Sequence, residues 1–379
     1  KLETYSAILL VIAAVAALVV SNTGLYHYYH DILHGKYSLD FGSLHLGMHS
    51  VLHWINDGLM TLFFLLVGLE MKREMLVGAL KTKAKMMLPI VAAIGGMVVP
   101  ALVFVGMNWS HPEHMNGWAI PIATDIAFSL GILSLIGSRV PSSLKVFLTA
   151  LAIFDDLGAV IVIAAFYTQN IHQIFLLFSL MLCVVLWLLN RGNVDQIWVY
   201  LVVGFILWLC VLESGIHPTL AGIAVAFAVP IKGSKKPNRS PLKILEKKLH
   251  LWVTFGVLPI FAFANAGVHF SDLSWSDLVS PLTLGITVGL FFGKQIGIFG
   301  LSYCAIKYGI AKRPTGMTNL HLYGLSLLAG MGFTMSLFIG GLAFGDNNLF
   351  EPNIRTGVLM GSFASAVFGY LILRFGKSQ

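Results

Sequence analysis

The chain is poor in charged residues. Asp, Glu, Lys and Arg together make up 11% of its 379 residues, whereas soluble globular domains carry about 25%. Hydrophobic residues reach 57%, and the mean hydropathy is +0.83. This balance excludes a soluble domain and predicts a polytopic membrane protein.

Cysteine and familiar catalytic motifs are also scarce. Cys183, Cys210 and Cys304 are the three cysteines, and all lie in apolar runs, so we expect free thiols and no disulfide framework. The sequence has no HExxH metal motif, phosphate-binding glycine loop or nucleophile elbow. No cofactor is therefore expected.

Twelve apolar runs are long enough to cross a bilayer, since a transmembrane helix needs about 20 such residues. They start near Tyr5, Val51, Met87, Gly117, Ser143, Ile174, Ile197, Gly215, Leu249, Leu282, Leu320 and Asn353. We therefore predict an all-α membrane protein with about 12 transmembrane helices in a single membrane domain, residues 1–379. No small-residue cleavage site follows the first run, so we expect a retained span and no signal peptide.

The distribution of basic residues predicts the orientation. With twelve spans, 21 of the 24 Lys and Arg residues fall on the side of the N-terminus. Lys36 and Arg355 lie on the other side, and Lys294 lies within a span. Cytoplasmic loops carry an excess of Lys and Arg, so both termini are predicted to be cytoplasmic. The net charge of +7 then reflects orientation and does not indicate nucleic-acid binding.

Two spans contain residues that interrupt helices. Ile120–Asp125 places a proline and a carboxylate in the fourth span, and Gly330–Thr334 places two glycines and a threonine in the eleventh. A proline kink or close glycine packing would explain either alone. Together, seven spans apart and running in opposite directions, they indicate crossing broken helices in inverted repeats of a secondary transporter.

The predicted repeats are spans 3–5 and 10–12. They cover approximately residues 87–167 and 282–376, and the remaining spans, approximately 5–77 and 174–268, would form an interface region.

Four charged residues lie within predicted spans: Asp125, Asp155, Asp156 and Lys294. Each costs at least about 2.5 to 3.5 kcal/mol in hydrocarbon, so such residues normally line a path for ions, protons or substrate. Asp125 is expected to neutralise the helix N-termini at the crossing and Lys294 the C-termini. Adjacent helical residues point about 100° apart, so one aspartate could face an aqueous funnel while the other meets Lys294. Purely structural ion pairs are the alternative.

Several long motifs in the same order closely resemble the NhaA family of bacterial sodium/proton antiporters, and the resemblance covers nearly the whole chain. The motifs are AIFDDLGA (152–159), GWAIPIATDIAF (117–128), FAFANAG (261–267) and GFTMS (332–336). The resemblance implies a twelve-span inner-membrane protein that exchanges cytoplasmic Na+ or Li+ for external protons.

The resemblance also implies roles for the buried charges. Asp155 and Asp156 would bind Na+ and carry protons, Thr124 and Asp125 would assist at the crossing, and Lys294 would pair with an aspartate as a candidate proton carrier. Hard cations prefer oxygen ligands, and burial favours a protonated carboxyl, so Na+ and H+ can compete for the same oxygens. If more protons enter than sodium leaves, the membrane potential supplies about 2.3 kcal/mol per net charge per 100 mV.

A second group of charges lies at the predicted cytoplasmic end. Its members are Glu70, Arg73, Glu74, Lys243, Glu246 and His250, at helical spacings of three and four. The resemblance implies that they sense cytoplasmic pH, and a solvated rim is the alternative. Lys247 stands where a family member can carry another histidine, so the pH threshold is left open.

The polar segment before the second span is the expected external hairpin. Residues 36–46 alternate in polarity around a Gly-Ser turn, and a flexible loop is equally compatible. The resemblance implies that this hairpin pairs two copies into a homodimer. His45, His49 and His53 have a spacing that could bind a metal, but an exposed external helix start is favoured. For Asp57 a structural role is expected, and for His217 a packed position at a span end is at least as compatible as a functional one.

Two other functions remain as alternatives, a membrane-embedded aspartate-dependent enzyme and a cation channel. An intramembrane aspartyl protease would need a second aspartate beside a glycine motif, which Gly330–Phe333 does not supply. A channel would keep an open polar pathway, whereas paired broken helices favour alternating access.

Overall fold

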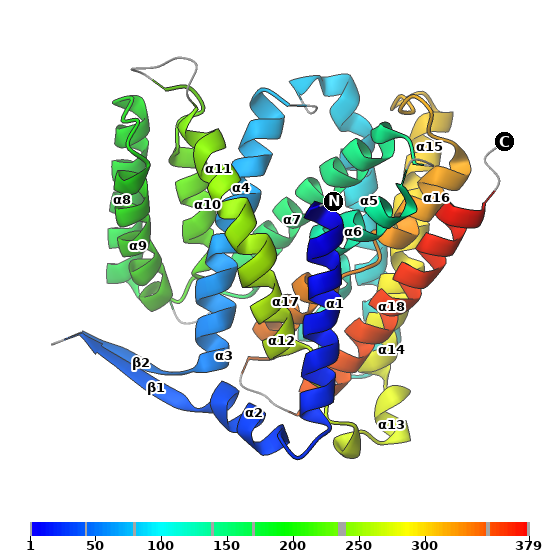
Figure 1. Cartoon of the computed structure of the whole chain (residues 1–379), viewed down its shortest axis with the longest axis horizontal. Helices are drawn as coiled ribbons and strands as arrows, with labels where there is room; N and C mark the ends of the chain where they lie inside the picture. The colour runs from blue at the N-terminus through cyan, green and yellow to red at the C-terminus, as the bar shows by residue number, and fades with distance from the viewer. Residues whose placement is uncertain are drawn as a thin grey trace. The chain divides into compact units, whose positions relative to one another are not determined.

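The computed structural model describes residues 2–41, 44–78, 81–137, 140–168, 171–233, 240–345 and 349–376. These residues are almost all helical, with one pair of strands (Figure 1). The chain divides into two compact units. The first unit comprises Lys1–Tyr29, Ala79–Ala159 and Ala262–Gln379, and the second comprises His30–Gly78 and Val160–Phe261.

The first unit holds most of the helices. They are α1 (Leu2–Ser21), α5 (Lys83–Asn108), η3 (Pro112–Ile122), α6 (Ile126–Ile136), η6 (Phe270–Asp272), α13 (Trp275–Leu278), α14 (Pro281–Val288), η7 (Gly289–Gly293), η8 (Gln295–Gly300), α15 (Leu301–Lys307), α16 (Asn319–Leu328), α17 (Phe333–Phe344) and α18 (Glu351–Phe375). The unit boundaries fall within α2 (Tyr26–His34), α7 (Ser142–Phe166) and α12 (Leu258–Asn265).

The second unit holds the strands and the remaining helices. They are β1 (Lys36–Phe41), β2 (Leu44–Ser50), α3 (Val51–Trp54), η1 (Ile55–Leu59), α4 (Met60–Leu76), α8 (Gln173–Arg191), α9 (Ile197–Ser214), α10 (Thr219–Ala228), α11 (Pro241–Trp252) and η5 (Val253–Val257). Its core packs apolar side chains of α4, α8, α9, α10 and α11.

The helices confirm the predicted all-α membrane class. Among the described residues, nine helices are long and apolar enough to cross a membrane, and two bent pairs raise the number to eleven. The eighth predicted run corresponds to α10, whose 10 residues are fewer than the about 20 that a span needs. The exact count of twelve therefore stays a prediction.

Both predicted interruptions are breaks in the structure. The 3-10 helix η3, which contains Pro121, is followed by α6 at an angle of 43°, and α16 is followed by α17 at 45°. Gly330 and Gly332 lie in the second break. Each bent pair lies between two long helical segments along the chain, α5 and α7 for the first pair and α14–α15 and α18 for the second.

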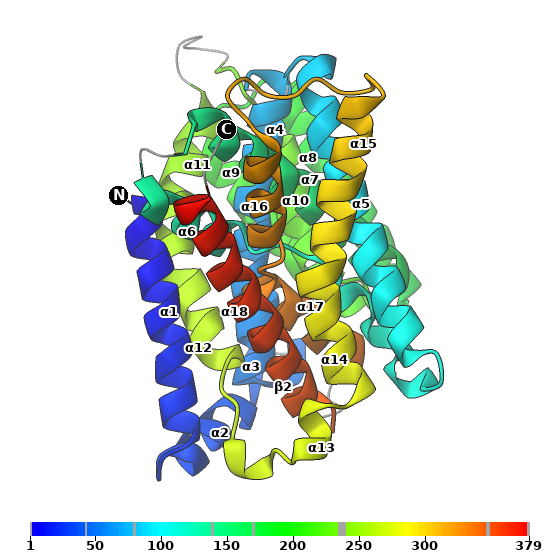
Figure 2. The ribbon, with the colours of Figure 1, turned by 90° about the vertical axis from the view of Figure 1, so that its right-hand side faces the viewer.

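The first helix of each repeat packs closely against the other. A Cβ atom on Gly297 would overlap the carbonyl of Gly95, and one on Gly285 would overlap the side chain of Asn108. Residue numbers therefore rise along one helix as they fall along the other, which makes α5 and α14–α15 antiparallel (Figure 2). Inverted repeats require this arrangement, and small residues allow the backbones to approach closely, as in other membrane helix pairs.

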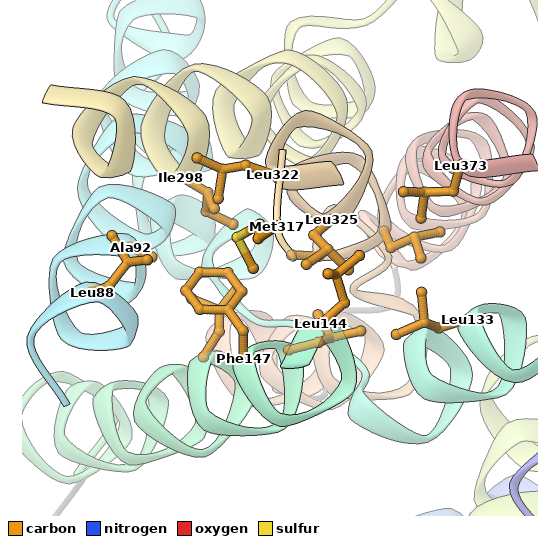
Figure 3. Close-up of a cluster of buried hydrophobic side chains, with 14 of the residues drawn as sticks. Leu88, Ala92, Leu133, Leu144, Phe147, Ile298, Met317, Leu322, Leu325 and Leu373 are labelled. Carbon is orange, nitrogen blue, oxygen red and sulfur yellow. The ribbon is translucent and has the colours of Figure 1, made fainter. Parts of the chain in front are cut away.

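The core of the first unit lies near the bent pairs. Phe147 of α7 and Met317, which precedes α16, are buried beside each other among leucine side chains from several helices (Figure 3). These include Leu88 of α5, Leu133 of α6, Leu325 of α16 and Leu373 of α18. This packing fixes the helices that carry the breaks.

The strands differ from one expectation. β1 and β2 pair antiparallel from Lys36 with Ser50 to Phe41 with Leu44, and the predicted Gly-Ser turn, residues 42–43, lies outside the described residues. His45 and His49 therefore lie in a strand, and the helix begins only at Val51, where Ser50 caps it by accepting from the His53 amide. The expectation of a helix start that carries all three histidines is wrong, because strand pairing continues to Ser50.

Candidate ion-binding site

The two breaks bond directly to each other in the first unit. The Asp125 amide donates to the Met331 carbonyl at 2.7 Å, and the Thr124 hydroxyl donates to the Ala329 carbonyl at 2.8 Å. A break leaves helix-terminal amides and carbonyls without partners inside their own helix. Here each break supplies partners for the other.

Asp125 binds the N-termini of two helices. Its carboxylate accepts from the Phe128 amide of α6 at 3.0 Å and from the Thr334 amide of α17 at 3.2 Å, and the Thr334 hydroxyl donates a further short hydrogen bond. Negative charge is stabilising at a helix N-terminus. The buried Asp125 side chain therefore serves both α6 and α17 where they begin.

Hydroxyl groups and one amine bind the facing carbonyls. Ser336 donates to the Ile120 carbonyl at 2.7 Å and Ser129 to the Leu328 carbonyl at 2.9 Å. The Lys294 amine donates to the Ile122 carbonyl, the last residue of η3, at 2.5 Å. Positive charge is favourable at a helix C-terminus, so the crossing carries an anionic and a cationic partner on its opposite helix ends.

Lys294 lies between two π-helical segments, η7 and η8, and its side chain is fully buried. Its amine also donates to Asp155 Oδ2 at 2.7 Å and to the Thr124 hydroxyl oxygen at 3.0 Å. An ammonium has three N–H donors, and with the Ile122 carbonyl all three have an oxygen partner.

The structure therefore pairs Lys294 with Asp155. Both Asp155 and Asp156 are 1% exposed, so neither faces an aqueous funnel here. Asp155 Oδ1 has no hydrogen-bond partner among the described residues, and the charge of Asp156 also acts on Lys294. An ammonium and two carboxylates thus lie together away from water. Burial of these charges costs folding free energy, and charged residues inside a membrane protein normally serve its function.

The five predicted residues at the crossing, Thr124, Asp125, Asp155, Asp156 and Lys294, all lie in this unit. The sequence singled out Thr334 in the second break without assigning it a partner, and it did not point to Ser129, Ser336 or the Ile122 carbonyl as partners at the crossing. Thr334 directly follows the glycine break, in the first turn of α17, and a side-chain hydroxyl in that place is a signal for a polar contact. Ser129 and Ser336 also lie in the first turns of their helices, α6 and α17, but neither stands beside a helix-breaking residue that would draw notice in the sequence.

The second predicted group comes together only in part, within the second unit. Arg73 donates to Glu246 at 2.9 Å and also pairs with Glu74, and the charge of Glu70 acts on Arg73. Three carboxylates from α4 and α11 thus surround one guanidinium. Lys243 is exposed and His250 is half-buried, and in the described ranges no hydrogen bond joins either side chain to these four.

Asp57 lies in the second unit as a buried structural partner. Its carboxylate contacts His53 Nε2 at 3.0 Å and His217 Nε2 at 3.5 Å. It therefore ties η1 to the preceding helix and to the loop before α10.

Two broken helices that bond at their breaks, with buried charges beside them, define the class of secondary ion transporters. The family model described as Na+/H+ antiporter 1 matches residues 1–373. The chain belongs to this family.

Similar proteins from three bacteria support this assignment. The Na+/H+ antiporter NhaA of Aliivibrio salmonicida is 53% identical over 374 residues, which cover 98% of this chain and 95% of the relative. Those of Vibrio parahaemolyticus and Vibrio cholerae are 51% and 50% identical, over 99% of this chain and 96% of each relative. Family membership makes the protein an ion transporter and gives no support to the enzyme or channel alternatives.

Replacing Thr334 with valine tests the contact between the breaks. The substitution keeps the volume and removes the hydroxyl bonded to Asp125, so we expect the free energy of unfolding to fall by about 1 to 3 kcal/mol. Thermal unfolding of the purified protein in detergent measures the loss.

Thr356→Val is the matched control, because the buried Thr356 hydroxyl makes no hydrogen bond within the described residues. Its loss should leave stability unchanged or raise it. Equal destabilisation by the two variants would contradict the role given to the Thr334 contact.

Proposed function

We propose that this antiporter binds its transported Na+ or Li+ at Asp155 and Asp156, and that protons compete for the same carboxylates. The observation that carries the proposal is the buried pair of aspartates beside Lys294. A hard cation binds to carboxylate, hydroxyl and carbonyl oxygens. The amine of Lys294 already contacts one oxygen of each kind, on Asp155, Thr124 and Ile122.

Those three contacts suggest how the ion and the lysine exclude each other. A sodium ion that takes the oxygens of Asp155 and Thr124 removes two of the three partners of the Lys294 ammonium. A buried ammonium left with one carbonyl and no carboxylate is strongly disfavoured, so Lys294 must move away or release its proton. Arrival of Na+ and departure of a proton are thereby coupled through one set of oxygens.

We also propose that the exchange is electrogenic. If the carboxylates and Lys294 together return more than one proton for each Na+ released, each cycle moves net positive charge into the cell. The membrane potential then contributes about 2.3 kcal/mol per net charge per 100 mV to sodium extrusion. No cofactor is needed, because the transported ions themselves drive the cycle.

We further propose that the repeats, residues 87–167 and 282–376, form the moving core and that residues 5–77 and 174–268 form the interface. The distribution of Lys and Arg supports an inner-membrane orientation with both termini in the cytoplasm. The cycle then exports Na+ from the cytoplasm and admits external protons.

The charges around Arg73 are proposed to sense cytoplasmic pH. Glu70, Glu74 and Glu246 place three carboxylates near one guanidinium, so their total charge changes when any of them takes up a proton. Lys243 and His250 extend the group along α11 in sequence, and their part in sensing rests on the family resemblance.

The hairpin formed by β1 and β2 is proposed to join two copies into a homodimer. The structure of one chain leaves the outer edges of this two-stranded sheet without a further strand among the described residues. Exposed strand edges readily pair with a second chain.

Replacing Asp156 with asparagine should abolish sodium-dependent proton movement at every pH. The amide keeps the shape but removes the charge and the titrating proton, so the site can neither neutralise Na+ nor load H+. Asp155→Asn should do the same. Quenching and recovery of a pH gradient in reconstituted vesicles measures the exchange.

Asp31→Asn is the control, because this side chain is 81% exposed and lies outside the crossing. It should exchange at the normal rate. Robust exchange by Asp156→Asn would refute the proposed site even though the family assignment would stand.

Replacing Glu246 with glutamine should shift the pH profile of exchange toward acid while the maximal rate persists. Without the charge of Glu246 there is less repulsion against ionisation of Glu70, so negative charge builds up around Arg73 at lower pH. The initial rate of exchange is measured across the pH range. Glu213→Gln, on α9 outside the group, is the matched control, and identical profiles for both variants would reduce the group to a structural ion pair.

Deleting residues 36–46 should convert dimers into monomers that still exchange ions. The deletion removes the strand edges and leaves both sets of membrane charges in place. Chemical crosslinking and size-exclusion chromatography report the oligomeric state. A deletion variant that still migrates as a dimer would show that the contact lies elsewhere.

A further inference from the structure

Three potential metal ligands lie together after the end of α5. His111, Glu113 and His114 each offer a ligand atom, and these atoms all lie within 4.8 Å of one another. His111 Nδ1 is 3.4 Å from Glu113 Oε1, and the two imidazole rings stack with centroids 5.1 Å apart. The group lies in the first unit, away from the aspartates of the crossing in sequence and outside the proposed transport chemistry.

A buried amide fixes the tautomer of His114. Asn108 is fully buried, and its Nδ2 atom donates to the Phe104 carbonyl at 3.0 Å, so its Oδ1 atom is an acceptor. That oxygen is 3.0 Å from His114 Nδ1, which must therefore carry the proton. The Nε2 atom is left with a lone pair. Metal-binding histidines characteristically donate their second ring N–H to such an oxygen, which orients the ring.

The donor set selects a class of metal. Two imidazoles and one carboxylate suit Zn2+ and related transition metals, whereas Mg2+ and Ca2+ prefer sites made of oxygen alone. Three protein ligands leave a fourth tetrahedral position for water. Glu113 is exposed and His111 half-buried, so an ion can enter from solution. We propose that His111, Glu113 and His114 form a Zn2+ site.

The position of the site connects it with both bent pairs. Glu113 and His114 lie in the first turn of η3, and the His114 ring packs edge-on against Phe350 at 5.2 Å. Phe350 in turn contacts Phe344, the last residue of α17, at 5.2 Å. Figure 2 draws the loop after α5 at the end of the view away from the N and C labels, the external side under the proposed orientation.

Zinc bound here would fix the outer end of η3, where all three ligands lie, together with the His114 ring that packs on Phe350 beside α17. Alternating access requires these segments to rearrange around the site, so external Zn2+ inhibits exchange. This consequence rests on the proposed function, whereas metal binding itself does not.

The binding test uses the full-length protein purified in detergent, with Co2+ as a spectroscopic probe and Zn2+ in calorimetric titration. The His111→Gln, His114→Gln double variant should bind one Zn2+ fewer than the unchanged protein and lose the visible absorption of four-coordinate Co2+. Asn108→Ala should weaken binding about 10-fold to 100-fold, because His114 loses its orienting partner.

The matched control is the His30→Gln, His34→Gln double variant. Those two rings also stack, at 4.2 Å, but belong to α2 and the second unit. The control should keep the site. Equal zinc stoichiometry in the unchanged protein and the His111/His114 variant would overturn the proposal, as would loss of the tight site only in the control.

Exchange in vesicles separates the two claims. External Zn2+ should slow exchange by the unchanged protein and by the control, and should have no effect on the His111/His114 variant, while Mg2+ affects none. Zinc binding at the site without inhibition would overturn the claim that bound Zn2+ inhibits exchange, and the proposed metal site would stand. If the unchanged protein binds zinc but performs no exchange at all, the proposed function fails and the site does not.

Discussion

The amine of Lys294 and its three oxygen partners are the interaction on which the crossing depends. The ammonium binds a carboxylate, a hydroxyl and a helix-terminal carbonyl from three different segments. Removing any one of these partners would leave an N–H of a buried ammonium without an acceptor, in a place that water does not reach. The first break, α7 and the π-helical region around Lys294 are therefore held in one arrangement by a single buried cation, and the proposed transport cycle works by replacing that cation with another.

Asp125 performs the complementary task on the other helix ends. It accepts from two main-chain amides and one hydroxyl, and neither α6 nor α17 would otherwise have a partner for those amides at the break. The crossing thus places one anion at the N-termini of α6 and α17 and one cation at the C-terminus of η3, while hydroxyl groups bind the carbonyls at the end of α16. These charged and polar contacts determine the geometry of the crossing more than apolar packing does, because apolar side chains can contact lipid as well as other helices.

The sequence predicted the charges and the breaks, and the physical reason is that both are expensive in a bilayer. Asp155, Asp156 and Lys294 stand out in apolar runs, and Pro121, Gly330 and Gly332 stand out in helices. The pairing of Lys294 with Asp155 rather than Asp156 could not be predicted, because adjacent residues differ only in direction around the helix. The hydroxyls of Ser129 and Ser336 were missed because serine is common in membrane helices. The continuation of the second strand from His45 through His49 was missed because a period of four also suits a helix.

The glycines between α5 and α14–α15 have a mechanical consequence. At Gly95 and Gly297 the two backbones are in direct contact, with no side chain between them. Rotation or translation of one helix against the other would bring the two main chains into steric overlap. We therefore expect the two helices to move together as one rigid pair, with Lys294 near its middle. We therefore expect a movement that opens the site to occur in the short bent segments, where the backbone is already interrupted.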